Sequence, residues 1–400
     1  MSEKKMAVMY GAGGIGRGFL GQLFYLSGYD TVFIDAKEQL AAEINRCGQY
    51  PIYITNGDRY EPFIVSNVSA VAASRTSDVA KKISEAYVMA TAVGANYLKH
   101  IASDIIAGLR MRMARDAEPL NIIICENIID ADVYLRTIVC EQLNETEKAW
   151  CQKNVGFVEA SIGRMIPAVP EHIKTVEPLA VCVEPYSTLP VNKKAIVGET
   201  PDIYNLLPSE PFRLYVRRKL YMHYMSHAIT AYLGAIYNYK YIYEASGDFG
   251  IRFVTLGALT EASNALAREF RIDNYTLLQY SFDLLSRFDN RLLGDTIARV
   301  GRDTARKLSA DDRICGLIRL CHKNSVTPHY VMIGLAAALH FNCEGDESSR
   351  EVYEFTRSNG VRAALAHYSG ITDPAICERT ERLYNMLGKA PLLDLINLPD

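Results

Sequence analysis

Met6-Ala-Val-Met-Tyr10 and the following Gly11-Ala-Gly-Gly-Ile-Gly-Arg-Gly-Phe19 decide the fold of this chain. The apolar run predicts a buried strand, and the glycine-rich turn after it leads into a helix. Gly11 permits a tight turn, Gly13 lets the backbone approach a pyrophosphate, and Gly16 lets the helix pack closely on the strand. The helix N-terminus offers N–H groups to the phosphates. The turn therefore predicts a dinucleotide site formed by Gly11, Ala12, Gly13, Gly14, Ile15 and Gly16.

An acidic residue follows the next strand at the spacing that such a site requires. The apolar run Thr31–Ile34 ends in Asp35, nineteen residues after Gly16. A carboxylate at this point accepts hydrogen bonds from the adenosine ribose and repels a 2′-phosphate. The sequence therefore favours NAD over NADP as the cofactor. Lys37 lies two residues further on and could tolerate the phosphate, although a solvated lysine at a helix start is the more common case.

The first half of the chain alternates apolar runs with helical stretches, which predicts a doubly wound parallel sheet of the Rossmann type. Ligands of such sheets bind outside the carboxyl ends of the strands. Thr91 and Val93 lie at the end of one predicted strand, and Asn127 lies at the end of another, so these three residues are predicted to contact the cofactor. The predicted strands are Met6–Tyr10, Thr31–Ile34, Tyr87–Ala92, Asn121–Cys125 and Val155–Val158, with further strands expected between Glu171 and Val197.

The second half has a different sequence pattern, in which apolar residues recur at helical spacing and turn residues are few. Five prolines between Pro185 and Pro211 predict the connection between two domains. We therefore expect a cofactor domain over residues 1–200 and a mainly α-helical substrate domain over residues 201–400. The predicted helices are Arg213–Tyr237, Thr260–Arg271, Asn274–Phe288, Ala310–Cys321, Tyr330–Phe341 and Ser348–Ser358.

Composition narrows the possible partners. A net charge of −3 means that the chain lacks the excess of basic residues typical of nucleic-acid-binding proteins. No apolar run is long enough for a membrane span. The N-terminus leads directly into the first strand, without room for a signal peptide. Nine scattered cysteines are typical of free thiols in the cytoplasm, which is the expected location. Cys315 and Cys321-His322 lack a second matched pair, so no metal is expected.

One segment of the second half carries the groups that hydride transfer at a carbinol needs, namely a base and a group that stabilises the reacting oxygen. At about 100° per residue, Lys219, His223 and His227 share one helix face, and Tyr224 lies at about 140° from Lys219. A lysine becomes a usable base when burial or nearby cations lower its pKa. The alternative is a solvated lysine beside two core histidines.

The chain resembles the mannitol dehydrogenase family of polyol-specific long-chain dehydrogenases over nearly its whole length, and is most similar to members that act on hexitol phosphates. Family members use NAD(P), need no metal, and join a Rossmann domain to a helical domain. The resemblance implies a monomer with Lys219 as general base and His227 orienting the substrate. Its motifs are the glycine-rich turn, Thr91–Gly94, Pro119–Asn127, Val155–Phe157, Arg218–Leu220, His227–Gly234, Arg299–Arg302, Arg306–Ala310 and Asp312-Arg313.

Two positions depart from the family pattern. Tyr224 stands where the family has an asparagine that polarises the reacting oxygen, and Gly163 stands where it has an aspartate. A tyrosine hydroxyl also donates to an oxyanion, but it reaches farther. The main hypothesis is interconversion of a hexitol phosphate and a ketose phosphate, of the mannitol 1-phosphate and fructose 6-phosphate type. The alternatives are a hexuronate (fructuronate or tagaturonate) reductase, a free-polyol dehydrogenase, and a catalytically silent NAD-binding protein.

A basic segment predicts a site for the anionic end of a sugar phosphate. On one helix, Arg299, Arg302 and Arg306 would share a face, and Lys307 would add a fourth cation. An arginine fork matches a phosphate bidentately. The resemblance makes Arg299 and Lys307 the main substrate contacts. Arg302, from the same segment, and His223 are predicted as further substrate contacts. The alternative is a solvated basic face.

Overall fold

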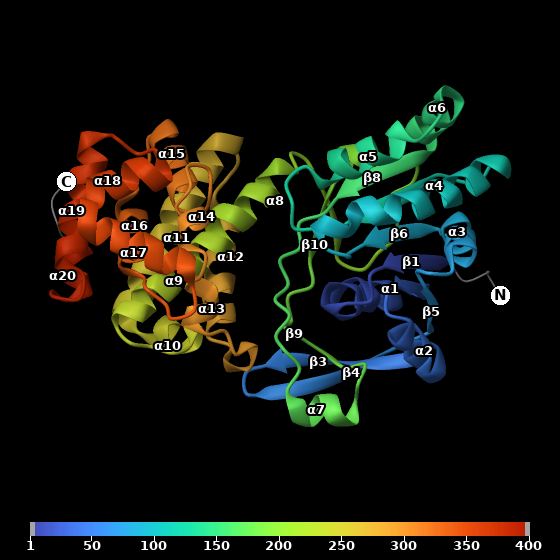
Figure 1. Cartoon of the computed structure of the whole chain (residues 1–400), viewed down its shortest axis with the longest axis horizontal. Coiled ribbons are helices and arrows are strands. Elements are labelled where there is room, and N and C mark those ends of the chain that lie inside the picture. Colours follow the sequence, from blue (N-terminus) through green and yellow to red (C-terminus); the bar gives the residue numbers. More distant parts are fainter. Residues whose placement is uncertain (1–4, 397–400) are drawn as a thin grey trace. The chain divides into compact units, whose positions relative to one another are not determined.

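The computed structural model describes residues 5–396 (Figure 1). The chain divides after Arg213 into two compact units, Met1–Arg213 and Leu214–Asp400. The sequence places the boundary at residue 200, but β11 (Leu206–Ser209) pairs with β10 (Leu189–Asn192) in the first unit. Because of that pairing, the proline-rich stretch belongs to the first unit and does not separate the two units.

A six-stranded sheet with the order β5-β2-β1-β6-β7-β8 forms the centre of the first unit. Every strand pair in it is parallel, which confirms the predicted Rossmann-type sheet. All five strands predicted up to residue 158 are present, and β5 is an addition at one edge. The strands are β1 (Met6–Tyr10), β2 (Asp30–Asp35), β5 (Val68–Ala72), β6 (Val88–Thr91), β7 (Leu120–Ile124) and β8 (Val155–Glu159).

Helices and a second sheet cover the two faces of this sheet. Alternate residues of β1 enter different cores: Ala7 and Met9 join one cluster, and Val8 and Tyr10 the other. Burial on both faces explains why the strands read as continuous apolar runs. The helical segments of this unit are η1 (Gly16–Leu20), α1 (Gly21–Leu26), α2 (Glu38–Cys47), α3 (Thr76–Glu85), η2 (Ala95–Tyr97), α4 (Leu98–Ala114), α5 (Ala131–Glu141), α6 (Glu145–Asn154), α7 (Glu171–Val176) and η3 (Lys193–Ala195).

The second sheet, β4-β3-β9, includes a hairpin that the sequence analysis missed. Strands β3 (Gln49–Asn56) and β4 (Arg59–Ser66) are antiparallel and are joined by Gly57-Asp58, with Gly57 at φ +60°. Asn56-Gly57 was the available signal for a hairpin. Between Glu171 and Val197, the expected strands are β9 (Val181–Val183) and β10, but the stretch begins with the short helix α7.

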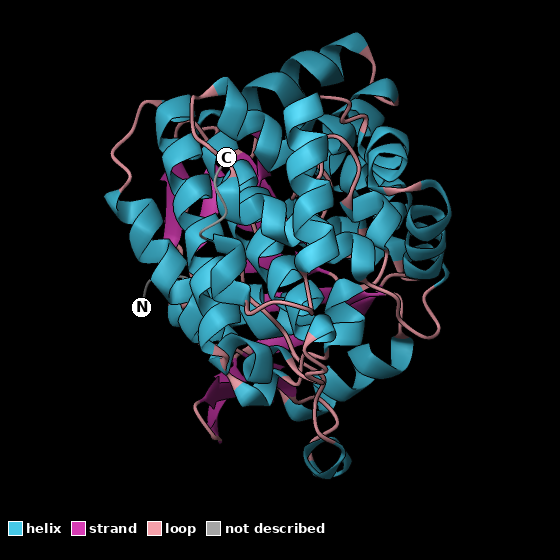
Figure 2. Cartoon of the chain, turned by 90° about the vertical axis from the view of Figure 1, so that its left-hand side faces the viewer, coloured by secondary structure: helices cyan, strands magenta, loops and turns pink. Residues whose placement is uncertain are grey.

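The second unit is almost entirely helical, as predicted (Figure 2). The predicted helix over residues 213–237 is one continuous helical stretch made of α8 (Arg213–Arg218), the π-helical η4 (Lys219–Tyr224) and α9 (Met225–Ile236). The remaining elements are α10 (Ile242–Gly247), α11 (Phe249–Phe270), α12 (Tyr275–Phe288), η5 (Arg291–Leu293), α13 (Ile297–Gly301), α14 (Thr304–Lys307), α15 (Cys315–Lys323), α16 (His329–His340), α17 (Glu347–Asn359), α18 (Val361–Ala364), η6 (Leu365–Ser369), α19 (Pro374–Met386) and α20 (Leu392–Ile396).

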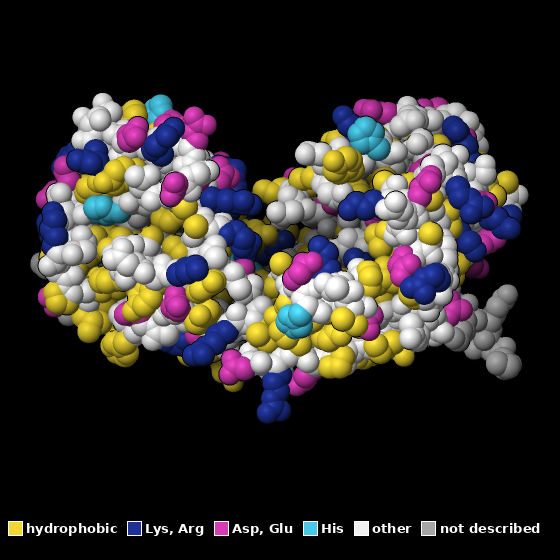
Figure 3. Space-filling model, turned by 60° about the horizontal axis from the view of Figure 1, so that its bottom comes forward, with side chains coloured by type: hydrophobic (Ala, Val, Ile, Leu, Met, Phe, Trp, Pro, Cys, Tyr) yellow, Lys and Arg dark blue, Asp and Glu magenta, His cyan; other side chains and the backbone are white. Residues whose placement is uncertain are grey.

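Charged side chains of both signs lie on the surface (Figure 3), as the small net charge of the sequence predicts. Asp and Glu side chains are interspersed with Lys and Arg side chains over the face drawn in Figure 3. Within residues 5–396, no helix combines the length and apolar character that a membrane span requires.

The approach of the first helix to β1 depends on Gly16. A Cβ atom at this position would lie 1.9 Å from the carbonyl oxygen of Gly11, a backbone atom that cannot turn aside. We expect Gly16→Ala to lower the free energy of unfolding by about 3 kcal/mol, measured by urea denaturation. Gly13→Ala is the matched control, because its Cβ would meet no atom within 4 Å. A stable Gly16→Ala variant would contradict this account of the helix packing.

Candidate cofactor and substrate sites

The glycine-rich turn has the geometry that phosphate binding requires. Gly11 has φ +100°, and a Cβ there would lie 2.3 Å from the carbonyl oxygen of Ala92, so only glycine fits. The space around Gly13 is open. Asp35 ends β2, and its Oδ2 accepts a 2.8 Å hydrogen bond from the backbone N–H of Ala12. The structure thus brings Asp35 against the turn, while Lys37 lies exposed beside it.

The ends of β6 and β7 contribute a carboxylate that the sequence analysis missed. Glu126 is buried, and its two oxygens accept hydrogen bonds from the N–H groups of Val93 (2.9 Å) and Gly94 (2.8 Å). This contact fixes the backbone of the predicted cofactor residue Val93. The Thr91 hydroxyl is buried and has no hydrogen-bond partner among the described residues. Asn127 directly follows Glu126 and lies just after the end of β7, at the end of a strand as the sequence predicts. A carboxylate at a strand end was the available signal for Glu126.

The segment with Gly163 is anchored by the arginine that follows it. Arg164 is buried and donates to the carbonyl oxygens of Gly18 and Glu184, both at 2.8 Å. A Cβ atom on Gly163 would lie 3.1 Å from Cε1 of Tyr186. An aspartate at position 163 would therefore require the Tyr186 ring to move. This local packing explains how glycine is accommodated at the family's aspartate position.

In the second unit, a π-helical turn places Lys219 against Tyr224. Segment η4 contains an i to i+5 hydrogen bond, from the Met225 N–H to the Leu220 carbonyl oxygen. Residues five apart then lie above one another. The Lys219 ammonium accordingly lies 5.3 Å from the centroid of the Tyr224 ring. The separation of about 140° expected for an α-helix is wrong for this turn.

The two histidines lie against a common aromatic ring. His227 stacks on Phe288 at 4.9 Å between ring centroids, and His223 lies 6.2 Å from the same ring. His223 is buried, and its Nδ1 has no hydrogen-bond partner among the described residues. Burial, together with the charges of Arg287 and His227, holds the pKa of His223 well below its ordinary value. His223 is therefore a neutral imidazole at physiological pH.

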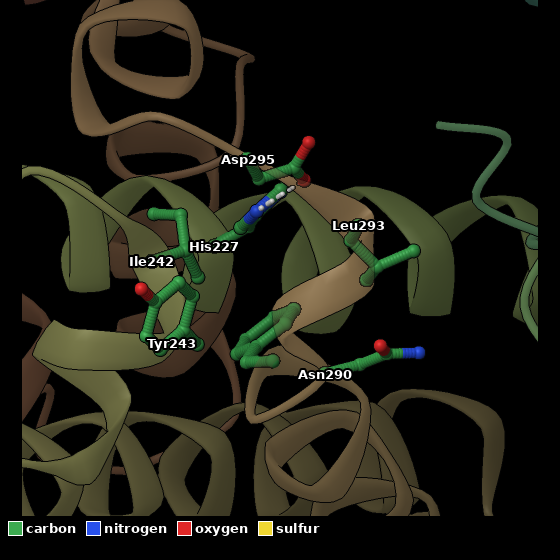
Figure 4. A pocket seen from close by; sticks show the side chains of 7 residues that line it. His227, Ile242, Tyr243, Asn290, Leu293 and Asp295 are labelled. Atoms are coloured by element: carbon green, nitrogen blue, oxygen red, sulfur yellow. Dashed lines mark ion pairs between the residues drawn. The ribbon is translucent and has the colours of Figure 1, made fainter. Parts of the chain in front are cut away.

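Asp295 orients His227. Its Oδ2 lies 3.3 Å from His227 Nε2, and Figure 4 shows this ion pair in a narrow pocket. Burial lowers the pKa of His227, and the hydrogen bond that His227 donates to Asp295 opposes that shift. Asp295 also pairs with Arg299. The remaining pocket residues shown are Ile242, Tyr243, Phe288, Asn290 and Leu293.

The basic segment is not a single helix, which corrects the sequence interpretation. Helix α13 ends at Gly301 and α14 begins at Thr304, with Asp303 in the left-handed conformation (φ +64°) between them. The predicted common face of Arg299, Arg302 and Arg306 therefore does not form. Asp303 permits the break, because the short aspartate side chain tolerates this conformation better than most residues.

The four cations of this segment have different surroundings. Arg299 is exposed and pairs with Asp295, and Arg306 pairs with Asp303 and Asp312. The exposed Arg302 side chain has no ion pair or hydrogen bond within the described part of the chain. Lys307 is buried and donates to the Val300 carbonyl oxygen. Burial, with the charges of Arg313 and Arg306, lowers the pKa of Lys307 to about 7.

No group of three or more His, Cys, Asp or Glu side chains among residues 5–396 is arranged to hold a metal ion.

Two family models together match most of the chain. The mannitol dehydrogenase Rossmann domain matches residues 5–205, and the mannitol dehydrogenase C-terminal domain matches residues 212–387. A mannitol-1-phosphate 5-dehydrogenase of Thermoanaerobacter pseudethanolicus is 34% identical over 92% of this chain and 94% of its own. The resemblance to the hexitol-phosphate members of the family is thereby confirmed.

Solved structures share the fold at low sequence identity. D-sorbitol dehydrogenase in substrate-free form superposes with a TM-score of 0.82 at 13% identity, covering 98% of this chain and 95% of that one. Pseudomonas fluorescens mannitol 2-dehydrogenase, in a ternary complex with NAD and D-mannitol, has a TM-score of 0.71 at 14% identity, covering 99% and 94%. Both family models and the curated relative agree in one conclusion: this chain belongs to the mannitol dehydrogenase family.

Proposed function

We propose that this protein is an NAD-dependent dehydrogenase that interconverts a hexitol phosphate and a ketose phosphate, of the mannitol 1-phosphate and fructose 6-phosphate type. The observation that carries the proposal is the 34% identity to a mannitol-1-phosphate 5-dehydrogenase over 92% of this chain. Family membership makes it a polyol dehydrogenase. The name of this relative, mannitol-1-phosphate 5-dehydrogenase, supports a phosphorylated substrate.

The first unit fits a bound dinucleotide. Open space at Gly13 admits a pyrophosphate, and Asp35 lies against the same turn, where its carboxylate can meet the adenosine ribose. Thr91, Val93 and Asn127 line the neighbouring strand ends, and Glu126 holds the Val93–Gly94 backbone in place. NAD held by these residues would supply the hydride acceptor for oxidation of the carbinol carbon.

The second unit supplies the proton chemistry. Lys219 Nζ accepts the hydroxyl proton of the polyol, or returns it when the ketose is reduced. His227 orients the substrate, and Asp295 holds its imidazole ring through Nε2. The Tyr224 hydroxyl replaces the family's asparagine as the donor to the reacting oxygen. A half-buried site strengthens each of these interactions relative to water.

A substrate screen tests the proposed function. NADH oxidation should be fastest with fructose 6-phosphate among ketose phosphates, free ketoses and ketohexuronates. Faster turnover of fructuronate or tagaturonate would identify a hexuronate reductase, and faster turnover of free fructose a free-polyol dehydrogenase. NADH binding without turnover of any of these substrates would identify a silent NAD-binding protein, a reading that the tyrosine at position 224 favours.

Asp35 is expected to set the cofactor preference. The ratio of kcat/KM for NADH to that for NADPH should be at least tenfold, which is about 1.4 kcal/mol, because the carboxylate repels a 2′-phosphate. Asp35→Ser should reduce this ratio and weaken NADH binding. Steady-state kinetics with both cofactors measure it, and Asp58→Ser, in the β3–β4 turn, is the control. Equal use of both cofactors by the wild type would refute the role of Asp35.

A further inference from the structure

We propose that Arg313 binds the anionic end of the substrate, an inference that rests on the proposed function and assigns the phosphate to a residue outside the 299–307 segment. Arg313 lies directly before α15 and is largely buried, with 12% of its side chain exposed. A buried guanidinium is a strong anion donor, because water competes weakly for its hydrogen bonds.

The hydrogen bonds of Arg313 leave its terminal nitrogens available. Its Nε donates to Asp312 Oδ1 at 2.7 Å, and this is its only side-chain hydrogen bond within the described residues. The two terminal nitrogens make no hydrogen bond there, yet they are not sealed from solvent. Asp312 thus fixes the orientation of the guanidinium and leaves its outer edge to a ligand. That edge matches two oxygens of a phosphate.

The position of Arg313 connects it with the proposed base. Its guanidinium carbon lies 5.0 Å from the centroid of the Tyr224 ring, and Lys219 Nζ lies 5.3 Å from the same centroid. A six-carbon sugar phosphate can therefore reach both groups, with its reacting carbon near Lys219 and its phosphate at Arg313. Lys307 is also near, because the charge of Arg313 contributes to lowering its pKa.

The other basic side chains of this region are either bonded to groups of the protein or exposed to water. Arg299 and Arg306 are exposed and paired with carboxylates, and Lys307 donates to a backbone carbonyl. Arg302 is exposed, so water screens its attraction for an anion. Of these side chains, Arg313 best combines burial, a fixed orientation and free donors.

The test compares charged and uncharged substrates. Arg313→Gln should lower kcat/KM for fructose 6-phosphate by about 10²- to 10³-fold and leave kcat/KM for free fructose within about threefold. Arg313→Lys should retain part of the preference, because lysine keeps the charge but not the fork. Arg362→Gln is the matched control: Arg362 also pairs with a carboxylate, Glu381, but 57% of its side chain is exposed. Unchanged thermal unfolding and NADH affinity would show that each variant is folded.

Binding of inorganic phosphate, followed by calorimetry in the presence of NADH, gives a readout independent of turnover. The wild type should bind phosphate and Arg313→Gln should not. Equal losses on both sugars, no loss on either, or a selective loss in Arg299→Gln instead would overturn the proposal. A wild type that does not reduce fructose 6-phosphate contradicts the proposed function alone, since the phosphate titration still decides the role of Arg313.

Discussion

Lys219→Ala is expected to lower kcat for polyol oxidation by about 10²- to 10⁴-fold while leaving the affinity for NADH within a factor of two. The hydroxyl proton would then have no positioned acceptor, whereas the glycine-rich turn proposed to bind the cofactor lies in the other unit. Steady-state kinetics give kcat, and fluorescence titration gives the NADH affinity. Lys323→Ala is the control, because Lys323 is an exposed lysine that pairs with Glu269.

A Lys219→Ala variant within a few-fold of the wild type would show that another group is the base. His223 would be the first candidate. Its imidazole is buried close to Lys219 and His227 in the chain, and its Nδ1 has no hydrogen-bond partner among the described residues. The double variant Lys219→Ala/His223→Phe would then lose the residual activity.

Tyr224→Phe is expected to lower kcat by about 10²- to 10³-fold, the range for removal of one donor to a developing oxyanion. Phenylalanine keeps the ring that contacts Lys219 and Arg313, so the positions of both cations are retained. The loss should therefore fall on kcat rather than on KM. Kinetics of fructose 6-phosphate reduction at saturating NADH separate the two.

An unchanged rate in Tyr224→Phe would make Tyr224 a packing residue. In that case the ring alone would hold the two cations, and the donor to the reacting oxygen would have to be the ammonium of Lys219. Tyr224→Leu provides the second comparison, because it removes both the hydroxyl and the ring. A loss that appears only in Tyr224→Leu would assign the effect to the ring.

The sequence determined the architecture of the cofactor unit and most of the helices of the second unit. A short apolar run such as Met6–Tyr10 that leads into a glycine-rich turn is typical of a strand buried on both faces, and the turn itself requires a backbone that few other residues allow. Asp35 was recognisable because its distance from Gly16 is set by one helix and one strand. These are local patterns, so chain order alone reveals them.

Contacts between distant residues could be determined only by the tertiary structure. Glu126 contacts Val93 and Gly94 because β6 and β7 are neighbours in the sheet. The break at Asp303 separates Arg299 from Arg306, although their spacing is that of a helix. The π-helical turn moves Tyr224 onto Lys219, and the fold then brings Arg313 to the same ring. A periodicity of 3.6 residues cannot anticipate an added residue in one turn, and no sequence spacing relates residue 313 to residue 224. Packing of the helices decided both.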